Sequence, residues 1–100
     1  MLDQKMMDFD WDPEKAKLNL KNHDGVSFDE ATTVWEDLFN IELFDADHSI
    51  DENRFLMIGE SSQHRLLLIS FTERDDKVRI ISARELTPKE RRDYEHGNFE

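Results

Sequence analysis

The fold is decided by residues 65–94, which read R-L-L-L-I-S-F-T-E-R (65–74), D-D (75–76), K-V-R-I-I-S-A-R (77–84), E-L (85–86) and T-P-K-E-R-R-D-Y (87–94). The runs 65–74 and 77–84 are apolar, rich in strand-forming residues and joined by a short acidic turn, which predicts an antiparallel hairpin. The last run begins with Thr87-Pro88 and continues with Glu90, the pattern of a capped helix. This stretch contains six of the seven arginines, so a site for phosphate or carboxylate is expected here.

The composition indicates a small, highly charged protein. One hundred residues, 37% hydrophobic and 37% charged, fit one domain spanning 1–100, of which we expect 9–95 to form the ordered core. No apolar run approaches the ~20 residues of a membrane helix, and the N-terminus lacks the pattern of a signal peptide. Without cysteine there is no disulfide or thiolate site. We therefore expect a cytoplasmic protein with no membrane contact.

Charge is distributed unevenly along the chain. The formal net charge of −11 disfavours nucleic-acid binding for the chain as a whole. Residues 1–53 carry fifteen acidic residues and four lysines, whereas residues 54–100 carry nine acidic and nine basic residues. The second half is therefore the expected place for an anion, and the acidic balance suits a partner with a basic surface.

Capping and periodicity predict the remaining helices. Asp12-Pro13 begins a first helix that ends near Gly25. Ser27 and Glu30 form a capping box for a second helix. The apolar stripe of this second helix is Ala31, Val34, Trp35 and Leu38.

Short strands are expected at 9–11, 41–44 and 54–58, with an acidic loop at 45–52. The resulting order is β-α-α-β-β-β-β-α. It predicts an α+β fold with an antiparallel β-sheet, two N-terminal helices on one face of the sheet, and a C-terminal helix over 88–95.

Turn lengths predict which side chains share a face of the sheet, because side chains alternate along a strand. The expected pairs are Glu73–Val78, Thr72–Arg79, Ser70–Ile81, Leu67–Arg84, Ile58–Leu67 and Arg54–Phe71. The expected core face holds Leu56, Ile58, Leu67, Ile69, Phe71, Val78 and Ile80, with Arg54, Arg65 and Arg84 towards strand ends. The other face is expected to hold Phe55, Met57, Leu66, Leu68, Ser70, Thr72, Arg79, Ile81 and Ala83.

Arg79 is the outstanding residue of that second face, since it lies in mid-strand beside two hydroxyl side chains. Two interpretations remain open. Arg79 binds an anionic ligand, or it pairs with a nearby carboxylate on a solvated face.

Several motifs together resemble a known family. They are F-D-W-D-P-E-K-A and G-V-S-F-D-E-A (9–16 and 25–31), D-x-D-H-S and E-x-R-x-x-x-I-G-x-S (45–49 and 52–61), and R-L-L-L-I-S-F-T-E-R, R-I-I-S-A-R and T-x-x-E-R-R-x-Y (65–94). In this order, over roughly residues 9–95, the chain resembles the BrnT toxin family. The resemblance implies a RelE-like fold and a ribonuclease toxin of a type II toxin–antitoxin system. It also implies a BrnA-type antitoxin that wraps the toxin and supplies the DNA-binding, autoregulating half of a hetero-oligomer.

RelE-like toxins cut RNA without a metal, by attack of a ribose 2′-hydroxyl on the adjacent phosphate, so the resemblance implies a need for a base, an acid and cationic groups. The candidate catalytic residues are Arg79, His48, Glu52, Arg54 and Arg65. The candidate substrate-binding residues are Thr72, Arg84 and Tyr94. Guanidinium groups suit phosphate, and a histidine titrates near neutral pH.

Each candidate also has a structural interpretation. His48 could bridge the acidic loop, Glu52 and Arg54 could form a local ion pair, and Tyr94 could anchor the last helix. The acidic residues of 45–51 suggest calcium, but the central glycine and terminal glutamate of an EF-hand are missing. We therefore expect no metal and no cofactor.

Two functions other than that of a ribonuclease are also compatible with the sequence. The alternative is a non-catalytic RelE-like interaction domain that acts as an antitoxin-binding partner or co-repressor, which the acid-rich surface favours. With either function, DNA is expected to be reached only through the antitoxin. An enzyme that acts on a nucleotide or a small acid through the arginine-bearing face ranks last, because no glycine-rich phosphate loop is present.

Overall fold

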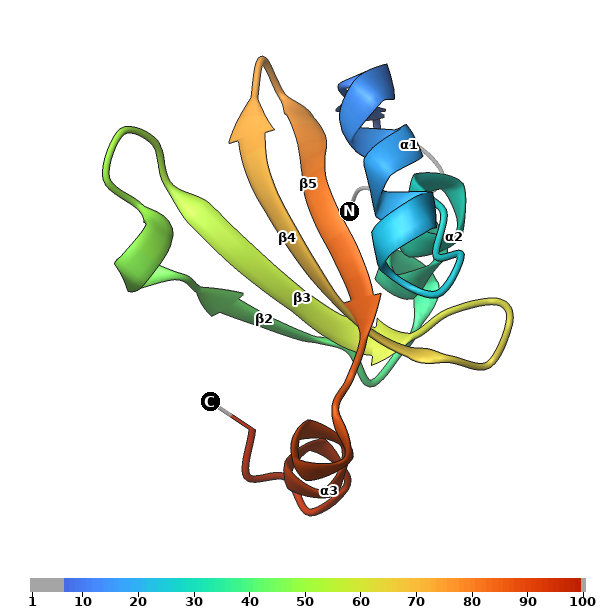
Figure 1. Ribbon diagram of the computed structural model, residues 1–100. Helices are drawn as coiled ribbons and strands as arrows, with labels where there is room; N and C mark the ends of the chain where they lie inside the picture. Colours follow the sequence, from blue (N-terminus) through green and yellow to red (C-terminus); the bar gives the residue numbers. More distant parts are fainter. Residues whose placement is uncertain (1–6, 100) are drawn as a thin grey trace.

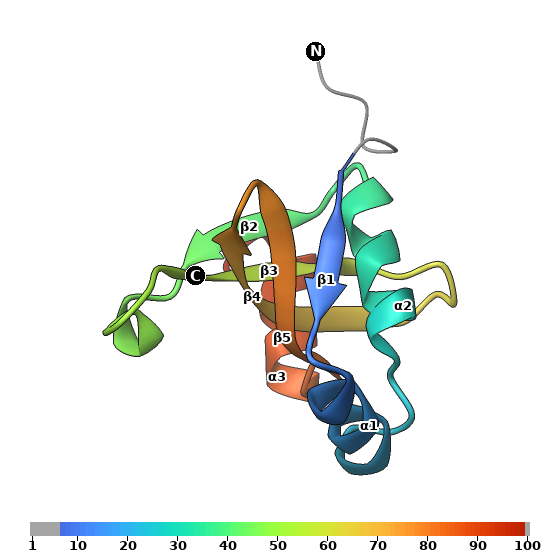
Figure 2. The same ribbon diagram turned by 90° about the horizontal axis from the view of Figure 1, so that it is seen from above.

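The computed structural model describes residues 7–99 and shows an α+β fold, as predicted (Figure 1). Its elements are β1 (Phe9–Trp11), α1 (Pro13–Asn22), α2 (Phe28–Thr32), the 3-10 helix η2 (Thr33–Glu36), β2 (Ile41–Phe44), the 3-10 helix η3 (Ala46–His48), β3 (Arg54–Glu60), β4 (Leu66–Arg74), β5 (Lys77–Glu85) and α3 (Pro88–Glu95). Helices α1 and α2 lie to one side of the sheet, and α3 lies below the end of β5 (Figure 1). Figure 2 shows the β2–β3 connection projecting on the side away from α2.

The five strands form one sheet in the order β1-β5-β4-β3-β2. Strands β2 to β5 pair antiparallel, whereas β1 pairs parallel with β5. The predicted antiparallel sheet is confirmed for β2 to β5, whereas the edge strand β1 makes the sheet mixed. A parallel pair requires a long connection, which the intervening helices and strands provide.

The helix starts follow from local side-chain bonds. The predicted caps of α1 and α3 are confirmed. At the start of α2, the Ser27 side chain accepts a hydrogen bond from the Glu30 backbone at 2.9 Å. The Glu30 side chain, however, does not complete the capping box, because it bonds Arg65 and Ser61 instead. A long-range partner has replaced the local one that the sequence pattern predicts.

The second helix is shorter than its apolar pattern predicts, because it tightens into η2 and ends before Asp37. The Asp37 carboxylate accepts a hydrogen bond from the Glu60 backbone at 2.7 Å, which fastens the chain to β3. Gly59 permits this approach, since a Cβ there would lie 2.8 Å from Asp37 Oδ2. Leu38, predicted to face the core, is consequently 92% exposed.

A β-bulge changes the face of the second half of β5. The predicted pairs Glu73–Val78 and Thr72–Arg79 are confirmed, but beyond Phe71 the register shifts. Ser70 lies opposite Ser82, and Leu68 lies opposite Arg84, so the predicted pairs Ser70–Ile81 and Leu67–Arg84 are wrong. One extra residue in a strand exchanges the faces of all that follow. Ala83 therefore enters the core, and Arg84 joins the face of Arg79.

The β3–β4 register also differs by one residue from the symmetric turn that the sequence predicts. Arg54 lies opposite Thr72 and Ile58 opposite Leu68, so the predicted partners Phe71 and Leu67 are wrong. Glu60 pairs with Leu66, so the turn includes Arg65 as well as residues 61–64, and His64 within it has a φ of 61°. Every β3 side chain consequently lies on the face opposite to the predicted one, apart from the glycine.

The two faces of the sheet have different coverings. The buried residues on the face covered by α1 and α2, with those of the helices, are Val26, Phe28, Ala31, Val34, Trp35, Met57, Leu67, Ile69, Phe71, Val78, Ile80 and Ala83. The opposite face, here called the open face, carries Asp10, Arg54, Leu56, Ile58, Leu68, Ser70, Thr72, Arg74, Lys77, Arg79, Ser82 and Arg84. Helix α3 covers only one end of the open face, where Tyr94 packs against the cluster of Ile58, Leu68 and Leu86. None of the helices within residues 7–99 is long and apolar enough to cross a membrane.

Candidate functional site

Four polar residues form one line across the open face. Asp10 of β1, Arg79 of β5, Thr72 of β4 and Arg54 of β3 are successive cross-strand partners, and we call this line the arginine row. Neighbouring strands lie about 4.8 Å apart, so the two arginine Cα atoms are about 10 Å apart. The Arg79 and Arg54 side chains are 29% and 32% exposed. Two long guanidinium side chains at this separation can reach the same phosphate group.

Both arginines of the row have a carboxylate neighbour. Arg79 Nη1 lies 3.4 Å from Asp10 Oδ2, and Arg54 Nη2 lies 3.6 Å from Glu52 Oε2. The structural interpretations of Arg79 and of the Glu52–Arg54 pair are thus both observed. Such long, partly exposed ion pairs contribute little to stability. Arg54 Nε and Asp10 Oδ1 are buried and have no hydrogen-bond partner among residues 7–99, so the row has unused hydrogen-bonding capacity.

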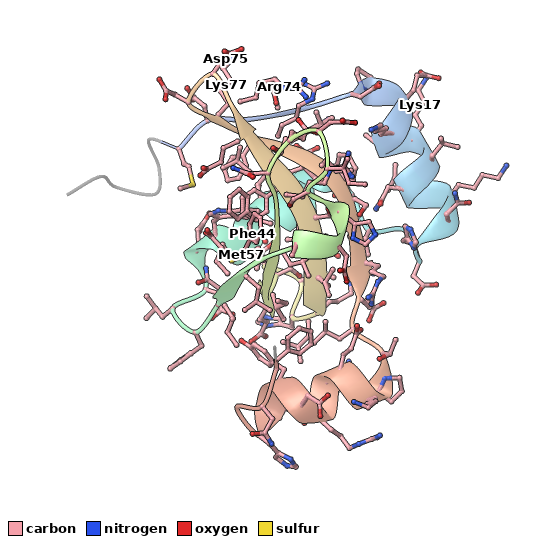
Figure 3. The ribbon with its side chains drawn as sticks, turned by 90° about the vertical axis from the view of Figure 1, so that its left-hand side faces the viewer. Lys17, Phe44, Met57, Arg74, Asp75 and Lys77 are labelled. Atoms are coloured by element: carbon pink, nitrogen blue, oxygen red, sulfur yellow. The ribbon has the colours of Figure 1, made fainter. Side chains whose placement is uncertain are left out.

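Two further cations adjoin the arginine row. Arg74 and Lys77 are cross-strand partners next to the Thr72–Arg79 pair, and they lie at the tip of the β4–β5 hairpin (Figure 3). Arg74 donates a 2.9 Å hydrogen bond to Glu52, and this bond is the main cause of a lowered Glu52 pKa. The sequence could have identified both cations. Their place beside the arginine row follows from the alternation of side chains along each strand and from the correctly predicted register of the hairpin tip.

His48 lies at the end of η3, in the connection that projects from the sheet, and its side chain is 69% exposed. Its Nδ1 is 2.9 Å from Asp45 Oδ2, as the structural interpretation expects. Ser49 ties this turn to β3, because its hydroxyl accepts a 2.9 Å hydrogen bond from the Arg54 backbone. The imidazole is therefore held on the loop that leads into the arginine row, with no direct side-chain bond to the row among residues 7–99.

Arg65 lies away from the arginine row, on the helix-covered side. It donates from Nε and Nη2 to Glu30, whose side chain is 1% exposed, and from Nη1 to the Asp24 carbonyl. The Arg65 hydrogen bond is the largest cause of a lowered Glu30 pKa and, in turn, of a raised Arg65 pKa. The guanidinium is thus engaged in joining the β3–β4 turn to α2.

Arg84 lies on the open face but is bound to α3. Its two terminal nitrogens donate to the Glu90 carboxylate at 2.8 and 3.0 Å, and Glu90 also accepts from the Thr87 backbone at 2.9 Å. The Arg84 bonds are the main reason that the pKa of Glu90 falls to about 2. This arginine therefore fastens the last helix to the sheet.

The two remaining candidates make structural contacts. The Thr72 hydroxyl is buried in the arginine row and donates to the Asn53 carbonyl at 2.6 Å, which fixes the start of β3. The Tyr94 hydroxyl donates to the Phe39 carbonyl at 3.0 Å, and burial raises the Tyr94 pKa. Tyr94 thus anchors α3 to the chain before β2. Within residues 7–99 no group of three or more His, Asp or Glu side chains is arranged to hold a metal ion.

Comparison with known proteins relates this geometry to a family. The chain is similar to the crystal structure of the Brucella abortus ribonuclease toxin BrnT, with a TM-score of 0.60 over 82% of this chain and 99% of that one. At 19% sequence identity this likeness concerns the fold. No curated protein matches the sequence significantly. The sequence model described as "Ribonuclease toxin, BrnT, of type II toxin-antitoxin system" matches residues 11–90. The chain therefore belongs to the BrnT family of type II toxin–antitoxin ribonuclease toxins.

Proposed function

We propose that this protein is an endoribonuclease toxin that cleaves RNA without a metal ion and is neutralised by a BrnA-type antitoxin. The observation that carries the proposal is the arginine row, in which Arg54 and Arg79 share one line on the open face of the sheet. Family membership supports the ribonuclease class. The row adds a place where a phosphodiester could be held.

In the proposed reaction the RNA phosphate lies against Arg79 and Arg54. The ribose 2′-oxygen forms a bond to phosphorus, the bond from phosphorus to the 5′-oxygen breaks, and a 2′,3′-cyclic phosphate results. The guanidinium groups stabilise the charge that accumulates on the phosphate oxygens in the transition state. Preorganised cations of this kind supply the role that a metal ion would otherwise have.

His48 is the proposed proton-transfer group, and Asp45 is the residue that orients its ring. The imidazole takes the proton of the 2′-hydroxyl or returns one to the leaving 5′-oxygen. Glu52 is less suited to either step, because its lowered pKa makes it a weak base and keeps it ionised. We assign Glu52 instead to positioning Arg54 and Arg74, with which it pairs.

A type II family implies an antitoxin partner. We propose that it is of the BrnA type, that it carries the DNA-binding function, and that its basic surface faces the acidic half of this chain. Residues 1–53 have fifteen acidic residues against four lysines, which supports such charge complementarity.

The test is cleavage of single-stranded RNA by the purified protein at low salt, with a chelator present and with or without the antitoxin. We expect cleavage products with a cyclic phosphate end, formed in the presence of chelator and abolished by the antitoxin. Stable antitoxin binding with no cleavage at any protein concentration would favour the non-catalytic interaction domain. Cleavage that requires added metal would contradict the proposed chemistry.

A further inference from the structure

A cleft of about 170 Å³ lies between α1 and the second half of β5. Strand β1 pairs with β5 only as far as Ile80, so beyond that residue α1 takes the place of a neighbouring strand. The buried Asn19 amide fixes the separation, since it donates to the Ala83 carbonyl at 2.8 Å and accepts from the Ala83 backbone at 3.0 Å. These two hydrogen bonds therefore hold the two walls of the cleft at a fixed separation.

The lining of the cleft combines apolar and polar groups. Leu18 and Ile81 provide apolar walls, and Lys15, Asn22, His23 and Ser82 provide polar groups. Pockets for drug-sized ligands measure about 300–1,000 Å³, so this one suits a smaller group such as one nucleobase with its phosphate at the rim. Single-stranded RNA offers such groups, because its unstacked bases can be inserted between side chains.

The cleft adjoins the arginine row. Ser82 lies on the open face, opposite Ser70, and is three residues after Arg79 on the same strand. At about 3.3 Å per residue, the two positions are at most about 10 Å apart. Neighbouring nucleotides of one RNA strand can therefore occupy the arginine row and the cleft together.

Lys15 is the residue of the cleft best placed to hold a phosphate. Among residues 7–99 no ion pair links it to a carboxylate, whereas Arg54 and Arg79 both have one. Its neighbour Lys17 is paired with Glu14 at 3.5 Å and does not line the cleft. In a chain of net charge −11, an unpaired ammonium group beside a cleft attracts a phosphate locally.

We propose that the α1–β5 cleft is a subsite for one nucleotide next to the cleaved phosphate, with the base between Leu18 and Ile81 and its phosphate on Lys15. This inference rests on the proposed function, because it takes the ligand to be RNA. It assigns a binding role to α1, which the arginine row alone does not require.

The test uses two matched pairs of variants on the same helix. Lys15→Ala is compared with Lys17→Ala, and Leu18→Ala with Leu20→Ala, because the second leucine is similarly exposed (46% against 57%) and lies outside the cleft. The probe is a short single-stranded 2′-O-methyl RNA, which binds but cannot be cleaved because its attacking hydroxyl is blocked. Binding is measured by fluorescence anisotropy over a salt series, and cleavage of unmodified RNA is measured in parallel.

We expect Lys15→Ala to weaken binding about tenfold and to reduce the slope of log K against log salt by about 0.7, the value for one phosphate contact on a single strand. Leu18→Ala should weaken binding about threefold without changing the slope. The Lys17 and Leu20 variants should resemble the wild type.

Equal effects of Lys15→Ala and Lys17→Ala on a protein that binds RNA would overturn the subsite and leave the arginine row intact. Lys15-dependent binding without cleavage of unmodified RNA would support the subsite and overturn the ribonuclease proposal. No binding of RNA at low salt would overturn both.

Discussion

Arg84 and Glu90 face each other through two parallel hydrogen bonds of 2.8 and 3.0 Å, and this pair joins β5 to the first turn of α3. The same carboxylate completes the capping box with Thr87. One glutamate thus starts the helix and attaches it to the sheet. Since no α3 side chain is fully buried, this pair has a large share in positioning the helix.

The first prediction concerns acid stability. The Glu90 pKa is about 2 in the folded protein and 4.5 ordinarily, so the pair stabilises the fold fully above pH 4.5 and loses its effect as the pH falls towards 2. With allowance for solvent screening, Glu90→Gln should lower the free energy of unfolding by about 2 kcal/mol at neutral pH. The difference from wild type should shrink below pH 4.5 and vanish only below about pH 2. Urea titrations across this range measure it, with the exposed Glu95→Gln as control, and a constant difference at all pH values would contradict the assignment.

The second prediction concerns catalysis. Arg79→Ala should reduce RNA cleavage by about 10²–10³-fold, the usual cost of removing one group that stabilises transition-state charge. The fold should be retained, because the Arg79 ion pair with Asp10 is long and partly exposed. Cleavage rates measure the loss of activity, growth arrest on expression measures the loss of toxicity, and thermal unfolding measures the retained fold. Arg91→Ala, on the exposed side of α3, is the charge-matched control, and full toxicity of Arg79→Ala would contradict the role of the row.

The third prediction separates Arg65 from the active residues. Arg65→Ala leaves the Glu30 carboxylate buried without its cation, which should cost about 3 kcal/mol of folding free energy. Toxicity should then fall because less folded protein is present. Pairing Arg65→Met with Glu30→Gln should recover much of the stability, since the buried charge is removed from both sides. If single-variant Arg65→Ala unfolds at the wild-type urea concentration yet loses activity, a catalytic role is indicated instead.

The fourth prediction concerns the junction of α1 with β5. Asn19→Ala removes the bonds to the Ala83 backbone and to the Val26 carbonyl, leaving buried polar groups unpaired. Each such group costs about 1–3 kcal/mol, so we expect a total loss of about 3 kcal/mol in unfolding free energy. Asn22→Ala, an exposed position on the same helix, should change stability by less than about 0.5 kcal/mol. Chemical denaturation of both variants measures the two unfolding free energies.

Local signals in the sequence predicted the elements of the fold. Asp12, Ser27 and Thr87 each accept a hydrogen bond from a backbone N–H two or three residues later. Contacts between residues this close in the chain can be predicted from the sequence pattern alone. The element order and the first part of the hairpin register follow for the same reason. The partner of the Glu30 side chain lies 35 residues along the chain, so its local pattern suggested a capping box that does not form.

The errors in the site have a common physical origin. Sheet register depends on single residues in turns and bulges, here His64 with its positive φ and the extra residue at Ile81. Each moves a set of side chains to the opposite face. Arg54 thereby joins Arg79 instead of the core. The catalytic and binding roles of the individual residues stay predictions until the variants are measured.

The bulge in β5 also determines how this strand tolerates change. Without an extra residue, positions 79 and 84 would lie on opposite faces, because they are an odd number of residues apart. With it, one strand presents Arg79 to the arginine row and Arg84 to α3. A substitution at Ile81 leaves every later side chain of β5 on its present face. A deletion there would turn the charged Arg84 towards the core and the buried Ala83 towards the open face. In this chain, a one-residue deletion in β5 should therefore be tolerated less well than a substitution.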